Sequence, residues 1–351
     1  MSNSKVYLVT GANGFIASSL VKRLVESGAT VHATVRRSSS GDDVKKSISS
    51  TATGKLHIFL TPDITTPGAF RDALKGVTHV FHTASPLPGG EGKTDAKRDF
   101  LDPARAGTLT LLQDAADAES VKKVVYTSSA ASVFDPSKLT TGNMHDEKDW
   151  NPITYEYALK AGEGLKSDKK DEVLQASFAV YTASKRVAEE AAWDFVKDNK
   201  PGFALAAVNP VLVIGPPTLG EGLSGSNGIF WEKLVTRPVR GEDATSAYVD
   251  VDDTVEGHIQ AMERAQADGK RFLLTAGQPL HHEVINWAKA KQPSVDFDKV
   301  EVPADAQEQE ERQTKFDNAL SRDVLGLKYR SVRESVERLV DWAVQSGAAK
   351  A

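Results

Sequence analysis

The segment VYLVTGANGFIASSLVKRL, residues 6–24, constrains the fold of this chain more than any other. Gly11 and Gly14 separate a short strand-like run from a helical pattern in which apolar residues recur every four positions. Glycines at such a junction permit a tight turn, and the free N–H groups and positive end of the following helix attract a pyrophosphate. The segment therefore predicts a strand, a turn and a helix that together bind a dinucleotide.

The same alternation continues along the chain. Runs rich in β-branched residues recur between segments of helical periodicity, and these runs are KVYLV, TVHATV, LHIFL, VTHVFH, VKKVVYT and FALAAVN. This order predicts an α/β fold, a Rossmann-like doubly wound parallel sheet with helices on both faces. After Asn209 the chain becomes rich in Pro and Gly. We expect residues 1–208 to form the dinucleotide-binding domain, with about 245–275 returning to it, and residues 209–244 and 276–351 to form a smaller substrate-binding region.

The composition of the chain limits the classes of molecule that it is expected to bind. The 43 basic and 48 acidic residues are spread along the chain and give a net charge of -5, so no basic block favours nucleic acid or an anionic membrane. The chain has no cysteine, which excludes disulfides and thiol catalysis and suits a cytoplasmic location. No apolar stretch approaches about 18 residues. We expect a small-molecule partner, no metal, and either a monomer or a homodimer.

Two arginines indicate which dinucleotide is bound. Folds of this type that prefer NAD place an acidic residue at the end of the second strand, about 20 residues after the glycine turn. This chain has Arg36 and Arg37 there, followed by Ser38 to Ser40. Guanidinium groups suit a 2′-phosphate. The predicted cofactor is therefore NADP(H).

Tyr181 and Lys185 stand four residues apart in a helix-like stretch, residues 177–195, and would share one helix face. Reduction of a carbonyl group needs a proton donor, and a nearby ammonium stabilises the phenolate that a tyrosine donor leaves behind. A hydroxyl is also needed to hold the substrate oxygen. The predicted strand end VVYTSSAASVF offers several hydroxyl groups at the edge where such folds bind ligands, those of Thr127, Ser128, Ser129 and Ser132.

The motifs TGANGFIA, HTAS, TSSAASVF, YTASK and NPVLVIGP, in this order, resemble the extended short-chain dehydrogenase/reductases. Over nearly its whole length the chain is similar to the branch with fungal aldehyde and ketone reductases, methylglyoxal-type reductases and plant dihydroflavonol reductases. The resemblance implies Ser129, Tyr181 and Lys185 as the catalytic triad. The cofactor contacts that the residues and the resemblance indicate are Gly11, Ala12, Asn13, Gly14, Phe15, Ile16, Arg36, Arg37, Asp63, Ile64, Thr83, Ala84, Ser85, Tyr181, Lys185, Pro210, Val213 and Ser226.

The chain departs from that family pattern in three places. Ala17 stands where the wider family has a third glycine, a replacement that the reductase branch tolerates. Relatives often carry a second basic residue where this chain has Ser40, and Arg37 is the candidate to replace it. The 52 residues from Ser129 to Tyr181 exceed the usual spacing because of a charged insertion, ALKAGEGLKSDKKDE. The insertion is either inert surface or a lid over the substrate entrance.

The expected activity is NADPH-dependent reduction of an aldehyde or ketone, with Tyr181 as the proton donor. A nucleotide-sugar epimerase or dehydratase of the same fold and a non-catalytic NADP-sensing regulator are the alternatives. The segments AASVF and NPVLVIGP are apolar and favour an uncharged, partly hydrophobic substrate. Candidate substrate contacts, any of which could equally be core residues, are Pro86, Ser132, Val133, Phe134, Phe230 and Trp231.

Overall fold

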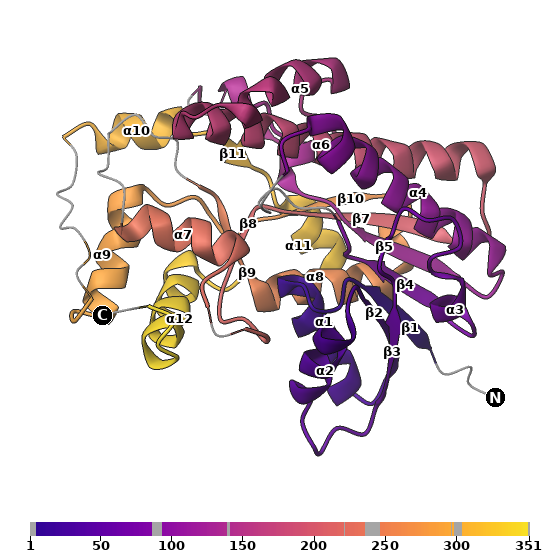
Figure 1. Ribbon diagram of the computed structural model, residues 1–351. Coiled ribbons are helices and arrows are strands. Elements are labelled where there is room, and N and C mark those ends of the chain that lie inside the picture. Colours follow the sequence, from indigo (N-terminus) through magenta and orange to yellow (C-terminus); the bar gives the residue numbers. More distant parts are fainter. Residues whose placement is uncertain are drawn as a thin grey trace.

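The computed structural model describes residues 5–85, 93–138, 141–220, 222–235, 246–295, 297 and 304–349. Its centre is a seven-stranded sheet in the order β10-β7-β5-β4-β1-β2-β3 in which every neighbouring pair is parallel (Figure 1). The strands are β1 (Val6–Thr10), β2 (Thr30–Val35), β3 (Lys55–Leu60), β4 (His79–His82), β5 (Lys123–Thr127), β7 (Ala204–Pro210) and β10 (Arg271–Leu274). The expected doubly wound α/β fold is confirmed.

Helices cover both faces of the sheet, because the strands are apolar on both sides and must be buried twice. One face packs against a cluster supplied by α1 (Phe15–Glu26), α2 (Ser38–Lys46), α8 (Val251–Glu263) and α11 (Ala319–Leu325). The other packs against α3 (Arg71–Leu74), α4 (Asp102–Asp117) and α6 (Lys170–Asn199). Strand order reverses between β1 and β4, so the carboxyl ends of these two strands open onto the crevice where such sheets bind ligands.

A third apolar cluster lies beside the sheet, to the left in Figure 1. It is built by β8 (Leu212–Ile214), which pairs with β9 (Tyr248–Asp250), and by α7 (Gly225–Val235), α9 (His281–Lys291) and α12 (Val332–Gln345). Ser331 caps α12 by accepting a hydrogen bond from the Glu334 N–H at 3.3 Å. Strand β10 and helix α8 belong to the sheet side although they follow α7 in the chain. The domain division given above stays a prediction.

Smaller elements complete the described chain. They are a π-helical turn η1 (Lys97–Leu101), short 3-10 turns η2 (Ala130–Ser132), η3 (Pro136–Lys138), η4 (Gly162–Lys166) and η5 (Ala265–Ala267), helices α5 (Tyr155–Ala161) and α10 (Ala306–Arg312), and the pair β6 (Met144–His145) with β11 (Lys315–Phe316). In the part of the chain that the structure describes, no helix has both the length and the apolar character to cross a membrane.

Helix α6 differs from its expected extent. It begins at Lys170, so Tyr181 lies well inside it rather than near its start. The preceding insertion is not loose surface, because Leu165 and Ala176 are buried with Val180 against Phe100 in a small apolar cluster. This packing stabilises the first turns of α6. The many charged residues of the segment gave no indication of these turns in the sequence.

Candidate active site

The turn between β1 and α1 has the shape that the glycine pattern predicts. Gly11 adopts φ +64°, and a Cβ added there would lie 3.1 Å from the Ala84 Cα, so a larger residue would meet backbone as well as strain. Gly14 is the N-cap of α1 and supplies no side chain to cap it. The first N–H groups of α1 are therefore free for an anion, and residues Gly11 to Ile16 fit a pyrophosphate.

Hydrogen bonds to Thr10 hold the residues that follow β4 against this turn. The Thr10 hydroxyl accepts hydrogen bonds from the N–H groups of Thr83 and Ala84, both at 3.1 Å, and lies 2.8 Å from His82 Nδ1. Because both lone pairs of Thr10 are used, its proton is donated to Nδ1 and His82 carries its own proton on Nε2. Burial lowers the pKa of His82 to about 3, so the ring stays neutral. The HTAS turn is thereby held rigidly beside Gly11.

The residues expected at the adenosine end lie after β2 and β3. Arg36 and Arg37 are exposed, and among the described residues neither guanidinium group makes an ion pair or a hydrogen bond. Asp63 is exposed as well, and hydrogen bonds from Thr65, together with the nearby Arg36 charge, lower the pKa of its carboxyl group. The guanidinium groups of Arg36 and Arg37 therefore suit the 2′-phosphate of NADP better than the uncharged 2′-hydroxyl of NAD.

The three predicted catalytic side chains meet at the carboxyl edge of the sheet. Ser129 follows β5, and its hydroxyl lies close enough to the Tyr181 phenol to affect the pKa of the phenol. Both residues are partly exposed, as contact with a substrate requires. Lys185 is buried on the same helix, with Nζ 5.8 Å from the Tyr181 ring centre and 3.2 Å from the Ser85 hydroxyl.

Burial dominates the titration of this pair. Burial raises the pKa of Tyr181, an effect that the neighbouring Ser129 hydroxyl reduces. It lowers the pKa of Lys185 to about 8, against the opposing charge of Glu189. At neutral pH the phenol keeps its proton and the ammonium stays largely charged, which is the state that a proton donor with an electrostatic partner needs.

The substrate-side predictions fall into two groups. Ser132, Val133 and Phe230 are at most 1% exposed. These three side chains lie in the core of this structure, and the proposed site does not include them. Phe134 is partly exposed, and Trp231 packs partly buried against the third cluster. Pro86 lies outside the described residues.

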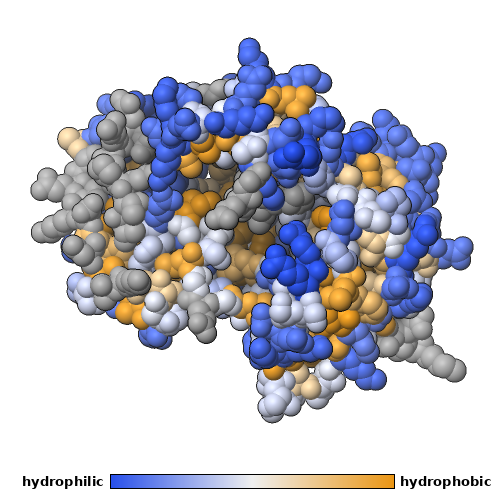
Figure 2. All heavy atoms as spheres, viewed as in Figure 1, coloured by the Kyte–Doolittle hydropathy of each residue, from blue (hydrophilic) through white to orange (hydrophobic). Residues whose placement is uncertain are grey.

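Two phenylalanines that the sequence did not single out join Phe134. Its ring centre lies 6.3 Å from that of Phe178 and 5.9 Å from that of Phe316. Phe178 is 44% exposed and stands three residues before Tyr181, a spacing that could have drawn attention to it. Phe316 comes from β11, and no local signal linked it to this place. In the space-filling view this face of the molecule is hollowed near its centre, and hydrophobic side chains show inside (Figure 2).

The remaining cofactor predictions come from separate parts of the chain. Pro210 ends β7 and is buried, Val213 lies in β8 with 6% exposure, and Ser226 is in the first turn of α7. Ile64 packs against Gly107 of α4, where an added Cβ would meet its side chain at 2.7 Å.

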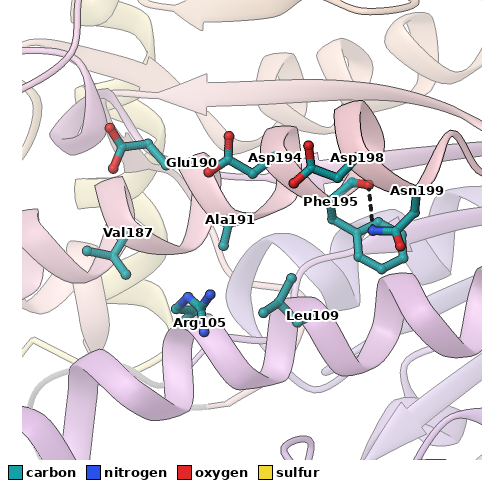
Figure 3. Close-up of a pocket in the computed structure, with 9 residues that line it drawn as sticks. All are labelled: Arg105, Leu109, Val187, Glu190, Ala191, Asp194, Phe195, Asp198 and Asn199. Atoms are coloured by element: carbon teal, nitrogen blue, oxygen red, sulfur yellow. Dashed lines mark hydrogen bonds between the residues drawn. The ribbon is translucent and has the colours of Figure 1, made fainter.

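A hollow of about 320 Å³ between α4 and α6 is separate from these residues (Figure 3). Glu190, Asp194 and Asp198 lie along its α6 side, and Arg105 points toward it from α4. No residue predicted for catalysis or cofactor binding lines it.

Comparisons with known proteins agree with this geometry. The model of the NAD dependent epimerase/dehydratase family matches residues 7–274. Aldehyde reductase 2 of Sporidiobolus salmonicolor is 34% identical over 347 residues, 97% of this chain and 96% of the relative. The ketoreductase azaE of Aspergillus niger is 34% identical over 349 residues, 95% and 96% of the two chains. The crystal structure of yeast methylglyoxal/isovaleraldehyde reductase Gre2 complexed with NADPH superimposes with a TM-score of 0.83 at 27% identity, covering 98% of this chain and 100% of that one.

Proposed function

The chain belongs to the NAD dependent epimerase/dehydratase family, and we propose that it is an NADPH-dependent reductase of aldehydes or ketones. The observation that carries the proposal is that Ser129, Tyr181 and the buried Lys185 lie together at the ligand-binding edge of the sheet. Relatives named as reductases across almost the full chain support it. On composition alone we propose the cytoplasm as its location, and either a monomer or a homodimer.

The residues divide the work of one reduction. Ser129 and Tyr181 donate hydrogen bonds to the carbonyl oxygen of the substrate and hold it at the sheet edge. Bound NADPH supplies the hydride that adds to the carbonyl carbon. As negative charge develops on the oxygen, Tyr181 transfers its phenolic proton to it, and the product is an alcohol. The Lys185 ammonium stabilises the phenolate left on Tyr181.

The cofactor is proposed to lie along the free end of α1, with its 2′-phosphate at Arg36 and Arg37. The substrate is proposed to be an uncharged and partly hydrophobic carbonyl compound, because Phe134, Phe178 and Phe316 supply aromatic surface close to Tyr181. A sugar nucleotide would bring two phosphates to this apolar surface, which disfavours the epimerase alternative.

Tyr181→Phe tests the mechanism. It removes one oxygen and keeps the ring, so NADPH affinity and folding should change little while turnover falls by about 10²-fold or more, as for loss of a positioned acid. Ser129→Ala should also lower turnover and spare cofactor affinity. Single-turnover rates and NADPH fluorescence titrations measure both effects. Tyr157→Phe, on an exposed tyrosine of α5, is the matched control. A Tyr181→Phe enzyme with most of its activity would rule the mechanism out.

Arg36→Ala tests the cofactor. A charged hydrogen bond to the 2′-phosphate is worth about 1.5–3 kcal/mol, so the ratio of kcat/KM with NADPH to that with NADH should fall by roughly tenfold or more. Removal of another exposed arginine, Arg105→Ala on α4, should leave the ratio unchanged. If the wild-type protein used NADH as well as NADPH, the assignment of Arg36 would be wrong.

A further inference from the structure

Glu189 is a fully buried carboxylate one helical turn after Lys185 and two turns after Tyr181. Its oxygens accept hydrogen bonds from Ser128 at 2.5 Å and Ser132 at 2.6 Å. They also accept from two side chains on neighbouring strands, Asn209 at 2.8 Å and Arg271 at 2.6 Å. We call these five residues, Ser128, Ser132, Glu189, Asn209 and Arg271, the Glu189 network. It joins α6 to the carboxyl ends of β5 and β7 and to the start of β10.

The network encloses the backbone of Ser129. Ser128 precedes Ser129 and is bound to Glu189 through its hydroxyl. Ser132, at the end of the same turn, is bound to Glu189 and lies 2.8 Å from the Ser129 carbonyl oxygen. The Ser129 hydroxyl is therefore presented by a turn whose two neighbouring serines are fastened to the helix that carries Tyr181. The relative position of the two catalytic oxygens depends on that connection.

Arg271 offsets the unfavourable burial of the Glu189 carboxylate. Its side chain is 9% exposed and neutralises Glu189. Its other donors bind the carbonyl oxygens of Glu147 at 2.9 Å and Asp149 at 2.7 Å, and the Trp150 ring centre lies 3.7 Å from its Cζ. The cation is satisfied on all sides by protein groups, so it is part of the scaffold and not a ligand for substrate.

Glu189 also acts on Lys185 through its charge. Burial lowers the pKa of Lys185, and the Glu189 carboxylate opposes that effect. The other groups around the ammonium are the Tyr181 ring on the same helix, the neutral ring of His82 at the end of β4, and the Ser85 hydroxyl in the turn that follows β4. Tyr126 of β5, whose pKa burial raises, is also close to Glu189 and Tyr181. Among the described residues, Glu189 is the anion that faces this set.

We propose that Glu189 is a positioning residue of the reaction, which holds the Ser129 turn against Tyr181 and supplies the negative charge that faces Lys185. The proposal rests on the reductase function proposed above. Tyr181, Ser129 and Lys185 touch the reacting groups, whereas Glu189 acts only through them. Its effect is on geometry and on protonation.

The test compares Glu189→Gln with Glu189→Asp in the full-length protein. Glu189→Gln should lower kcat/KM roughly 10- to 100-fold, the cost of a small misplacement of catalytic groups. Its alkaline limb in a plot of kcat/KM against pH should move roughly two units lower, the size expected for loss of a charge one helical turn, about 6 Å, away at an effective dielectric near 20. This sign holds whether the limb reports Lys185 or Tyr181, because loss of an anion makes either proton easier to remove. Glu189→Asp keeps the charge, so its limb should stay in place while kcat falls.

Two further variants separate this role from simple loss of folding. Glu189→Gln/Arg271→Met removes both charges, so its melting temperature should recover relative to Glu189→Gln and its limb should move part of the way back. Its kcat/KM should stay low, because the side chains that hold the Ser129 turn to α6 are gone. Asp114→Asn, at a buried carboxylate that accepts from the Phe70 N–H at 3.0 Å, should lower the melting temperature without moving the limb.

The proposal is overturned if the double variant regains the wild-type kcat/KM together with its stability, or if Asp114→Asn shifts the limb equally. It is also overturned if Glu189→Gln is active with an unmoved limb. These outcomes differ from failure of the reductase mechanism, which shows as an active Tyr181→Phe enzyme.

Discussion

At the level of single residues, Lys185 is a cation whose burial disfavours its charged form. A folded-state pKa of about 8, below the ordinary 10.5, means that its protonated form is less stable in the folded protein than in the unfolded chain. A difference of that size corresponds to about 3 kcal/mol. This loss of folding stability has its full size below pH 8 and disappears as the pH rises from 8 to 10.5. Because the lysine lowers stability, we attribute its presence here to the proposed reaction.

Lys185→Met should therefore have opposite effects on stability and activity. At pH 7 the free energy of unfolding should rise, by up to about 3 kcal/mol, because a desolvated charge is replaced by an apolar chain of similar length. Turnover should collapse and NADPH binding should weaken. Urea unfolding at pH 7 and pH 10 measures the change, and the advantage of the variant should shrink at the higher pH. Equal stability of the two proteins at pH 7 would contradict the expectation.

At the level of elements, the charged insertion is an integral part of the packing around α6. Gly162 of η4 sits so close to η1 that an added Cβ would lie 2.4 Å from the Ala96 Cβ, and 3.4 Å from a methyl group of Val180. Val180 directly precedes Tyr181. The insertion therefore packs against the helix segment that carries the proposed proton donor.

Gly162→Ala should force α5 and η4 away from Ala96. We expect a loss of about 1–3 kcal/mol in unfolding free energy, as for overpacking of a filled core, and a lower turnover because Val180 moves with it. Chemical denaturation and steady-state rates measure the two effects. Gly202→Ala, where an added methyl group meets nothing within 4 Å, is the matched control and should change neither. Unaltered stability in Gly162→Ala would show that the insertion is loosely held.

At the level of the whole molecule, two buried neutral histidines govern the response to acid. His258 donates from Nδ1 to the Thr254 carbonyl oxygen at 2.8 Å and accepts at Nε2 from the Thr127 hydroxyl at 2.7 Å. Burial lowers the pKa of His258 to about 4 and that of His82 to about 3. Between these values and the ordinary 6.5, the unfolded chain binds protons that the folded protein does not.

Stability should consequently fall as the pH drops below 6.5, with each histidine contributing about 1.4 kcal/mol per pH unit until its folded-state pKa is approached. Urea unfolding between pH 7 and pH 5 measures the slope. His258→Gln keeps a donor and an acceptor but cannot titrate, so its slope should be smaller than that of the wild-type protein. Identical slopes would mean that His258 is accessible to protons in the folded state.

The sequence by itself determined the features that depend on local order and spacing. Strand runs alternating with helical segments predicted the doubly wound sheet, because each element's periodicity is a property of its own residues. The turn at Gly11 and the arginine at position 36 predicted the cofactor site, since both sit at fixed offsets from a strand end. Tyr181 and Lys185 were found for the same reason, four residues apart on one helix.

Only the tertiary structure decided which of the hydroxyl groups after β5 faces the crevice. Ser129 is partly exposed, whereas Ser128 and Ser132 turn inward to Glu189, and burial of this kind depends on what packs behind the turn. The same holds for Arg271, which is 82 residues from Glu189 in the chain, and for Phe316, which reaches Phe134 from β11. Long-range contacts leave no periodic trace in a sequence, because they are selected by the shape and charge of distant elements after those elements have folded together.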